Sequence, residues 1–216
     1  MIRLRDVRFR PHVRAPWVLD GVSLHVAPGA LLGVVGAPSS GKSTLLRVAA
    51  TLLEATHGDV VVDGHDSLVD PSGARARLGY VPHHRDASGA TPRAGLSLLA
   101  DAWGLDRRAV DDVLDLTGVS AWADRAPQTL STVELRRLSL AEALLHDPPA
   151  LILDDPLSDV APEARAWFVD LVAELAALGK AVLVSAPERE LLEALCPRVA
   201  TLHAGHLSLP AEELDP

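Results

Sequence analysis

Hydrophobic and polar residues alternate in two stretches near the start of the chain. In residues 2 to 9 apolar and arginine positions interchange, although not perfectly, and residues 22 to 26 alternate more cleanly. A period of two places the apolar side chains on one face of a strand, so both stretches predict half-exposed antiparallel strands. Pro28-Gly29 predicts a turn after the second strand.

The next elements are marked by continuous apolar runs. Residues 31 to 35 form such a run and predict a buried strand, which the segment 36 to 41 interrupts. From Ser43 onward apolar residues recur at helical spacing, at Leu45, Leu46, Ala49, Leu52 and Leu53. We expect this helix to end at His57-Gly58 and a further strand to begin at residues 60 to 62.

The second half of the chain combines a helical segment with further buried strands. Apolar positions in residues 84 to 146 recur at helical spacing without a clear strand pattern, so we expect a helical insert there. Beyond it we expect a buried strand at 151 to 153, a helix at 162 to 178 with a proline near its start, and a buried strand at 181 to 185. This order indicates one α/β domain, residues 1 to 216, with parallel core strands.

Composition and charge narrow the possible classes of protein. Of the 216 residues 48% are hydrophobic, which is enough for a buried core. The formal net charge of -9 argues against a nucleic-acid-binding surface, since phosphate backbones are bound by basic patches. The lone Cys196 excludes an intrachain disulfide and fits a reducing cytosol.

The sequence predicts no direct insertion into a membrane. The N-terminus is charged and lacks the apolar core of a signal peptide. The longest strongly apolar runs are far too short to span a bilayer. Any role at a membrane would therefore depend on a partner protein.

The segment after the predicted strand at 31 to 35 matches the phosphate-binding pattern G-x-x-x-x-G-K-[ST] without a mismatch. Its glycines let the backbone approach phosphates, and successive amides then point into one concavity at the positive end of the following helix. Lys42 would place its charge on the β- and γ-phosphates, and the Ser43 hydroxyl would ligate Mg²⁺. The predicted nucleotide-binding residues are Gly36, Ala37, Pro38, Ser39, Ser40, Gly41, Lys42, Ser43 and Thr44.

A carboxylate that complements the phosphate loop is expected at the end of the strand at residues 151 to 153. Asp154 follows that strand, and a carboxylate there can hold Mg²⁺ through water. By itself Asp154 would be a weak signal, because many buried strands end in aspartate. Together with the phosphate loop it predicts a site for ATP and Mg²⁺, with Ser43 and Asp154 facing the metal.

At this point the chain resembles the nucleotide-binding domains of ABC transporters, from residue 1 to about 209. The resemblance implies a P-loop NTPase core sheet of the ABC type, an antiparallel β subdomain, and a helical subdomain at about 84 to 146. It also implies dimers in which one subunit's phosphate loop faces the other's signature segment across a shared ATP. Besides the loop and Asp154, it rests on Val18-Leu19-Asp20-Gly21-Val22-Ser23, Pro28-Gly29, Leu78-Gly79-Tyr80-Val81-Pro82, Leu130-Ser131, Ala143-Leu144-Leu145-His146-Asp147-Pro148 and Ala204-Gly205.

Two of the family's positions that contact ATP or its metal are changed. The aromatic residue that stacks on adenine falls near Pro11, which cannot stack like a tyrosine, and Phe9, His12 or Trp17 could replace it. The glutamine after the Tyr-Val-Pro segment is His83. Its ring could contact the metal shell or face solvent, and the sequence leaves both alternatives open.

The signature segment, Leu-Ser-Gly-Gly-Gln in the family, reads Leu130-Ser131-Thr132-Val133-Glu134. Ser131 keeps its hydroxyl, but both glycines are lost. The β-branched Val133 would obstruct the close approach of the backbone to a γ-phosphate. Glu134 adds negative charge beside that phosphate. The sequence therefore predicts a damaged signature.

The hydrolytic positions differ from the family in the same direction. Asp155 stands in place of the catalytic glutamate and is one methylene shorter, so we regard it as a weak candidate for the general base. Pro187 replaces the switch histidine and offers no donor to a γ-phosphate. In the segment Ser158-Asp159-Val160-Ala161, Ala161 replaces the aspartate that couples the two sites.

These combined changes predict a chain that keeps ATP binding and has weak or no hydrolysis. The alternative is that nearby groups replace the missing ones, and the candidates are His83, His84 and Glu188.

The leading hypothesis is an ATP-binding subunit of an ABC-type membrane transporter, cytoplasmic and peripheral on the inner face of the cell membrane. It would pair with a membrane-spanning permease subunit and form a homodimer, or a heterodimer with a second ABC ATPase subunit. The first alternative is a regulatory module outside transport that dimerises on ATP. The second is a small-molecule P-loop kinase, which would need an arginine-rich lid, whereas Arg107-Arg108 and Arg136-Arg137 fall on expected helix surfaces.

Overall fold

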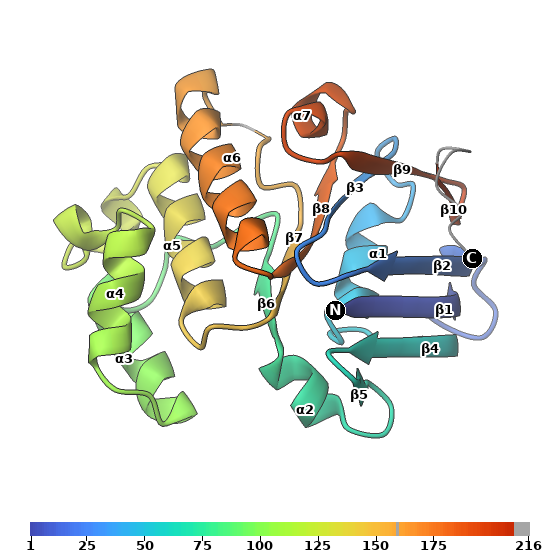
Figure 1. The fold of residues 1–216 in the computed structure, drawn as a ribbon, viewed down its shortest axis with the longest axis horizontal. Helices are drawn as coiled ribbons and strands as arrows, with labels where there is room; N and C mark the ends of the chain where they lie inside the picture. Colours follow the sequence, from blue (N-terminus) through green and yellow to red (C-terminus); the bar gives the residue numbers. More distant parts are fainter. Residues whose placement is uncertain (159, 210–216) are drawn as a thin grey trace.

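The computed structural model describes residues 1–158 and 160–209, which form two β-sheets and a group of helices (Figure 1). The strands are β1 (Ile2–Phe9), β2 (Leu19–Val26), β3 (Leu31–Val35), β4 (His57–Val62), β5 (His65–Asp66), β6 (Leu78–Val81), β7 (Ala150–Leu153), β8 (Ala181–Ala186), β9 (Arg198–His203) and β10 (His206–Ser208). One sheet is antiparallel, with the order β2-β1-β4-β5. The other has the order β10-β9-β3-β8-β7-β6 and is parallel except for β10. The chain is an α/β protein, as the sequence predicts.

The helices of residues 92 to 177 lie on the side of the six-stranded sheet that faces away from the antiparallel sheet, whereas the two helices within residues 42 to 76 lie next to the antiparallel sheet (Figure 1). The α-helices are α1 (Lys42–Ala49), α2 (Pro71–Ala76), α3 (Pro92–Trp103), α4 (Arg108–Leu116), α5 (Thr132–Leu144), α6 (Pro162–Ala177) and α7 (Glu190–Glu193). Between residues 84 and 146 every element is helical, with short 3-10 turns at Ser120–Trp122 and Pro127–Thr129. Within the described ranges, none of the helices has the length and apolar character needed to cross a bilayer.

The central strands are buried on both faces, which explains their continuous apolar sequences. In β7, Leu151 and Leu153 join a core with α3, α4, α5 and α6, whereas Ala150 and Ile152 join a second core with the antiparallel sheet and α1. Successive strand residues point to opposite faces, so a strand between two cores must be apolar at every position. The apolar run at residues 31 to 35 indeed forms β3 between these cores.

The imperfect alternation at the start of the chain corresponds to an irregular strand. The pairing of β1 with β2 shifts register between Leu4 and Val7 and again before Phe9. Asp6 lies in this interval with a φ of 44°, a conformation that is uncommon for a non-glycine residue. A bulge inserts an extra residue and so breaks the period of two.

The helix that follows the phosphate loop is shorter than the sequence predicts. It ends at Ala49, and Thr51 takes a left-handed conformation with a φ of 58°. The amide of Leu52 then donates to the carbonyl of Arg47, which is the bond of a Schellman-type helix end. The prediction that the helix continues to His57-Gly58 was therefore wrong, and His57 is the first residue of β4.

Candidate functional site

The residues between β3 and α1 form a tight loop whose shape depends on its glycines. A Cβ on Gly36 would lie 2.4 Å from the carbonyl oxygen of Leu202 and 2.6 Å from Oγ of Ser40. Gly41 has a φ of 103°, in the left-handed region that favours glycine. Ser39 also lies in this region, with a φ of 64°. The loop can therefore close only with small or conformationally free residues at these points.

The loop surrounds a hollow of about 190 Å³ at the start of α1. Within the described residues no side chain caps the start of this helix. The amides of its first turn have no partner inside the helix, because the carbonyls that would pair with them lie before its start. Oγ of Ser40 is also buried without a hydrogen-bond partner in this part of the chain. Free amides at a helix start bind phosphate groups, so the hollow fits a phosphate. It is lined by Val18, Ser39, Gly41, Lys42, Ser43 and Thr44.

The Lys42 ammonium lies against the same loop. Its Nζ donates to the carbonyl oxygens of Gly36 at 2.6 Å and Ala37 at 3.1 Å. Burial lowers the pKa of Lys42, while the nearby carboxylates of Asp155 and Asp154 raise it. The loop thus places one cation next to the free amides, where both can contact the same anion.

Asp154 extends from the end of β7 toward the first turn of α1. Its side chain is buried, and its Oδ1 accepts a hydrogen bond from Oγ of Ser43 at 3.1 Å. Oδ1 also accepts from Oγ of Ser185 at 3.0 Å, and Oδ2 accepts from the Tyr80 hydroxyl at 3.4 Å. The structure therefore brings the two predicted metal-binding residues together. Ser185 and Tyr80 belong to the same network, although the sequence predicted no role for either.

The oxygen donors of Ser43 and Asp154 fit Mg²⁺, a hard cation that prefers oxygen ligands. In the described residues no group of three or more histidine, cysteine, aspartate or glutamate side chains could hold a metal ion. Mg²⁺ keeps several waters and is usually bound by one or two protein carboxylates together with substrate phosphates. The pair would therefore hold the metal only together with a nucleotide.

Asp155 directly follows Asp154 and is held in place by several contacts. It has a φ of 51°, and its amide donates to Oγ of Ser185 at 3.1 Å. Its Oδ1 accepts from Oγ of Ser158 at 2.6 Å. Its Oδ2 lies 3.3 Å from Nδ1 of His83, close enough for an ion pair but without the geometry of a hydrogen bond. His83 thus contacts the candidate base instead of pointing only into solvent.

The residues of the signature segment form hydrogen bonds with one another at the start of α5. Ser131 Oγ accepts from the Glu134 amide at 3.3 Å and donates to Glu134 Oε2 at 2.8 Å. Glu134 Oε2 also accepts from the Ser131 amide at 2.7 Å, which completes a capping box. Arg125 binds the other carboxylate oxygen at 3.1 Å. The backbone hydrogen bond from Ser131 is the largest cause that lowers the Glu134 pKa. The Ser131 hydroxyl is therefore already engaged within its own chain.

The remaining hydrolytic positions lie at the surface. Pro187 is exposed just after β8, and Glu188 and His84, two of the possible replacement groups, are exposed as well. Ala161 is the exposed N-cap of α6 and forms no side-chain cap. Asp159, in the coupling segment, lies outside the described residues. Of the three replacement candidates only His83 contacts Asp155 in the described structure.

The candidates for contact with adenine differ in their surroundings. Pro11 is exposed, whereas Phe9 packs against the core that contains the antiparallel sheet. The guanidinium of Arg10 lies 4.4 Å from the centre of the Trp17 ring, and the His57 ring lies 5.7 Å from it on β4. Trp17 therefore already has partners. Trp17 does not line the phosphate hollow, whereas Val18, the next residue in the sequence, does.

The arginine pairs do not form a lid over the phosphate loop. Arg136 is buried, contrary to the surface position that the sequence predicts, and it donates to the carbonyl oxygen of Pro82 at 3.0 Å. The Arg137 guanidinium lies 3.9 Å from the centre of the Trp167 ring on α6. The long side chains of both arginines pack between elements, and Arg136 is therefore absent from the surface. Arg107-Arg108 are exposed at the start of α4, as predicted.

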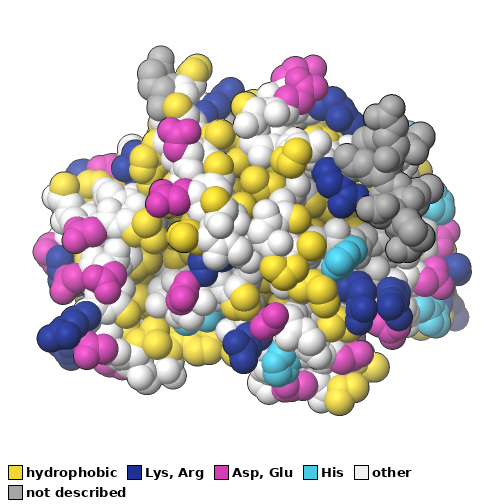
Figure 2. Space-filling model, in the orientation of Figure 1, with side chains coloured by type: hydrophobic (Ala, Val, Ile, Leu, Met, Phe, Trp, Pro, Cys, Tyr) yellow, Lys and Arg dark blue, Asp and Glu magenta, His cyan; other side chains and the backbone are white. Residues whose placement is uncertain are grey.

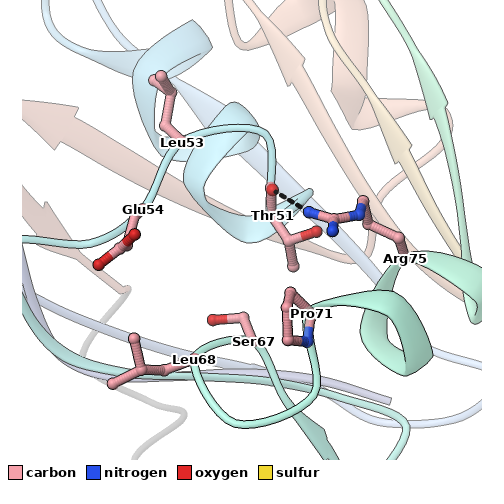
Figure 3. A pocket seen from close by; sticks show the side chains of 7 residues that line it. All are labelled: Thr51, Leu53, Glu54, Ser67, Leu68, Pro71 and Arg75. Atoms are coloured by element: carbon pink, nitrogen blue, oxygen red, sulfur yellow. Dashed lines mark hydrogen bonds between the residues drawn. The ribbon is translucent and has the colours of Figure 1, made fainter.

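A second hollow, of about 270 Å³, lies away from the phosphate loop, between the chain that follows α1 and the start of α2 (Figure 3). Figure 3 shows Arg75 next to Thr51, whose carbonyl oxygen accepts from the Arg75 guanidinium at 3.5 Å. None of the predicted site residues lines this hollow, although it is larger than the hollow at the loop. Its residues are Thr51, Leu53, Glu54, Ser67, Leu68, Pro71 and Arg75.

Comparison with solved structures shows the same fold over the whole chain. An ATP-binding cassette described as a dimeric post-hydrolysis state bound to ADP and Pi superposes with a TM-score of 0.87 and 21% identity, covering 100% of both chains. The ATP-binding subunit of an ABC transporter superposes with a TM-score of 0.85 and 22% identity, covering 97% of this chain and 89% of the other. The fold is that of an ABC-type P-loop NTPase.

Sequence comparisons identify the family. The methionine import ATP-binding protein of Burkholderia lata is 32% identical and covers 96% of this chain, while this chain spans 64% of its length. The Nod factor export ATP-binding protein I of Paraburkholderia xenovorans is 33% identical over 87% of this chain and 64% of its own length. A family model described as ABC transporter matches residues 19–158. With a complete phosphate loop next to Asp154, the chain belongs to the ABC transporter family.

Proposed function

We propose that the chain is an ATP-binding subunit of an ABC-type membrane transporter. It binds Mg-ATP at the phosphate loop and couples this binding to a membrane-spanning permease subunit, with hydrolysis weak or lost. The observation that carries the proposal is the hollow at the uncapped start of α1, with Lys42 and Ser43 in its wall and Asp154 beside Ser43. The relatives are named as import and export proteins, which favours transport over a separate regulatory module.

In this proposal residues 36 to 44 bind the nucleotide. The amides at the start of α1 contact the phosphates, and the Lys42 ammonium exchanges its bonds to loop carbonyls for bonds to phosphate oxygens. A bound Mg²⁺ would neutralise phosphate charge. Ser43 and Asp154 are the residues that would hold it, and Asp154 is too buried to be solvated by bulk water.

The hydrolytic half of the site supports only slow turnover in this proposal. Asp155 is the only base candidate at the end of β7, but its carboxylate already accepts from Ser158 and lies near His83. A base must reach the attacking water within hydrogen-bond distance, and the Asp155 side chain is one methylene shorter than the family's glutamate. Pro187 adds no donor on the neighbouring strand end. The chain therefore binds ATP better than it cleaves it.

The assembly that we propose contains a permease subunit and a second ABC ATPase subunit, which is either another copy or a different chain. The chain acts in the cytoplasm, on the inner face of the cell membrane, and needs no nucleic acid. The dimeric cassette with the same fold supports pairing of the ATPase subunits. The signature Thr132-Val133 would face the partner's phosphate loop in such a pair.

Titration of ATP onto the purified chain tests the proposal. We expect saturable binding in the presence of Mg²⁺, and weaker binding when the metal is removed with a chelator, because Ser43 and Asp154 then lose the ion that joins them to the phosphates. Isothermal calorimetry measures both affinities. No binding in either condition would refute the proposed function.

Bare lipid should not retain the chain. Figure 2 shows one face, on which lysine and arginine side chains are interspersed with aspartate and glutamate, and the whole sequence has a net charge of -9. Anionic membranes attract clusters of basic residues, so neither the net charge of this chain nor any helix in its described residues would anchor it. We expect the chain to stay at the bottom of a flotation gradient with liposomes of anionic lipid. Strong flotation without a partner protein would contradict the proposed mode of membrane association.

A further inference from the structure

Ser185 joins the two acidic residues of the site. The register between β7 and β8 pairs Leu153 with Val184, so the residues that follow them, Asp154 and Ser185, lie side by side. The Ser185 side chain is fully buried. Its Oγ accepts from the Asp155 amide at 3.1 Å and lies 3.0 Å from Asp154 Oδ1.

These contacts fix the direction of the Ser185 proton. A hydroxyl group has one proton, and Oγ already accepts a hydrogen bond from the Asp155 amide. A carboxylate oxygen can only accept, so the Ser185 proton must point to Asp154. The hydrogen bond to a charged group is a strong one, and its position inside the sheet protects it from water.

Ser185 contacts the carboxylate independently of the phosphate loop. Asp154 Oδ1 accepts from both Ser43 and Ser185, but only Ser43 belongs to the loop that receives the nucleotide. The third contact, from Tyr80, is longer at 3.4 Å and reaches the other oxygen. Ser185 is therefore the hydroxyl that can orient Asp154 whatever ligand the loop contains.

We propose that Ser185 is a positioning residue, which orients the Asp154 carboxylate for the cation of bound Mg-ATP and fixes the backbone of Asp155 beside it. The inference rests on the proposed function, because it assigns a role in that same site. Ser185 does not touch the nucleotide or the metal. It acts through Asp154, as residues around metal ligands commonly do.

The test compares ATP affinity with Mg²⁺ and with a chelator, measured by calorimetry on the whole chain. For Ser185→Ala we expect the Mg²⁺-dependent gain in affinity to fall about 10-fold or more, as is typical when a residue that orients a metal ligand is lost. The affinity without metal should not change, because Lys42 and the loop amides are intact. Ser185→Thr keeps the hydroxyl and should retain the gain.

Ser139→Ala is the matched control, since Ser139 is also a buried serine but donates to the carbonyl oxygen of Leu135 within α5. It should keep the full Mg²⁺-dependent gain. If Ser185→Ala does not fold, as judged by circular dichroism, Ser185→Cys keeps the size and weakens the donor, and it should lose part of the gain.

An unchanged gain in folded Ser185→Ala or Ser185→Cys would overturn the inference, as would an equal loss in Ser139→Ala. These results differ from a failure of the proposed function, in which the wild-type chain itself would not bind ATP.

Discussion

ATP affinity should fall about 10- to 100-fold when Lys42 is replaced by alanine, since a hydrogen bond to a charged group contributes about 1.5 to 3 kcal/mol. Lys42 is the cation of the phosphate loop, and its Nζ lies next to the free amides at the start of α1. No other side chain that lines the hollow is positively charged. Titration of labelled ATP onto wild type and Lys42→Ala in the presence of Mg²⁺ measures the effect.

Lys180→Ala provides a matched control, because Lys42 and Lys180 are the only lysines in the sequence. Nζ of Lys180 lies 2.5 Å from a carboxylate oxygen of Asp147, in the loop before β7, and also donates to the carbonyl oxygen of Pro148. Its replacement removes the same charge outside the phosphate loop and should leave ATP affinity unchanged. Equal affinities of Lys42→Ala and wild type would show that the nucleotide binds elsewhere.

Hydrolysis by the wild-type chain should be far slower than the typical enzyme range of about 1 to 10³ s⁻¹. The carboxylate of Asp155 is short and already accepts from Ser158, and Pro187 offers no donor. We expect Asp155→Glu together with Pro187→His to raise turnover more than either change alone, because a base and a phosphate contact act on one transition state and are not additive. A restored base typically contributes about 10² or more in rate. Steady-state phosphate release measures these rates.

The double variant should still be limited in a homodimer by the altered signature. Adding Thr132→Gly and Val133→Gly removes the two side chains at the start of α5 and should raise turnover further. The inactive Lys42→Ala version of this quadruple variant controls for contaminating ATPases. Wild-type turnover within the normal enzyme range would contradict the prediction and would direct attention to His83, which lies 3.3 Å from Asp155.

The position of the phosphate loop in the fold could be predicted because all of its residues are contiguous. A glycine-rich turn with this spacing, between a buried strand and a helix, predicts a phosphate-binding loop, and the structure places the segment between β3 and α1. The strands between the two cores were also predictable, since burial on both faces requires a continuous apolar run. Asp154 could be assigned only as the partner of that loop, because its own signal is common.

Contacts between distant segments could not be read from the sequence. Ser185 lies next to Asp154 because β7 and β8 pair in parallel, and His83 contacts Asp155 because β6 is adjacent to β7. The strand β6 itself was not predicted, since four residues that include a glycine carry no clear period. Strand order in a sheet is decided by packing, which has no local signature.

The sequence alone determined the fold class and the place of the glycine-rich loop between a buried strand and a helix, because local spacing and apolar periodicity encode them. It also supplied the hypothesis that this loop binds a nucleotide and that Ser43 and Asp154 bind the metal. Only the tertiary structure decided where the loop helix ends, since Thr51 adopts a left-handed conformation that few non-glycine residues take. It also decided that the Ser131 hydroxyl is engaged by Glu134 and that Ser185 supports Asp154. These outcomes depend on hydrogen bonds that form only after the segments have met.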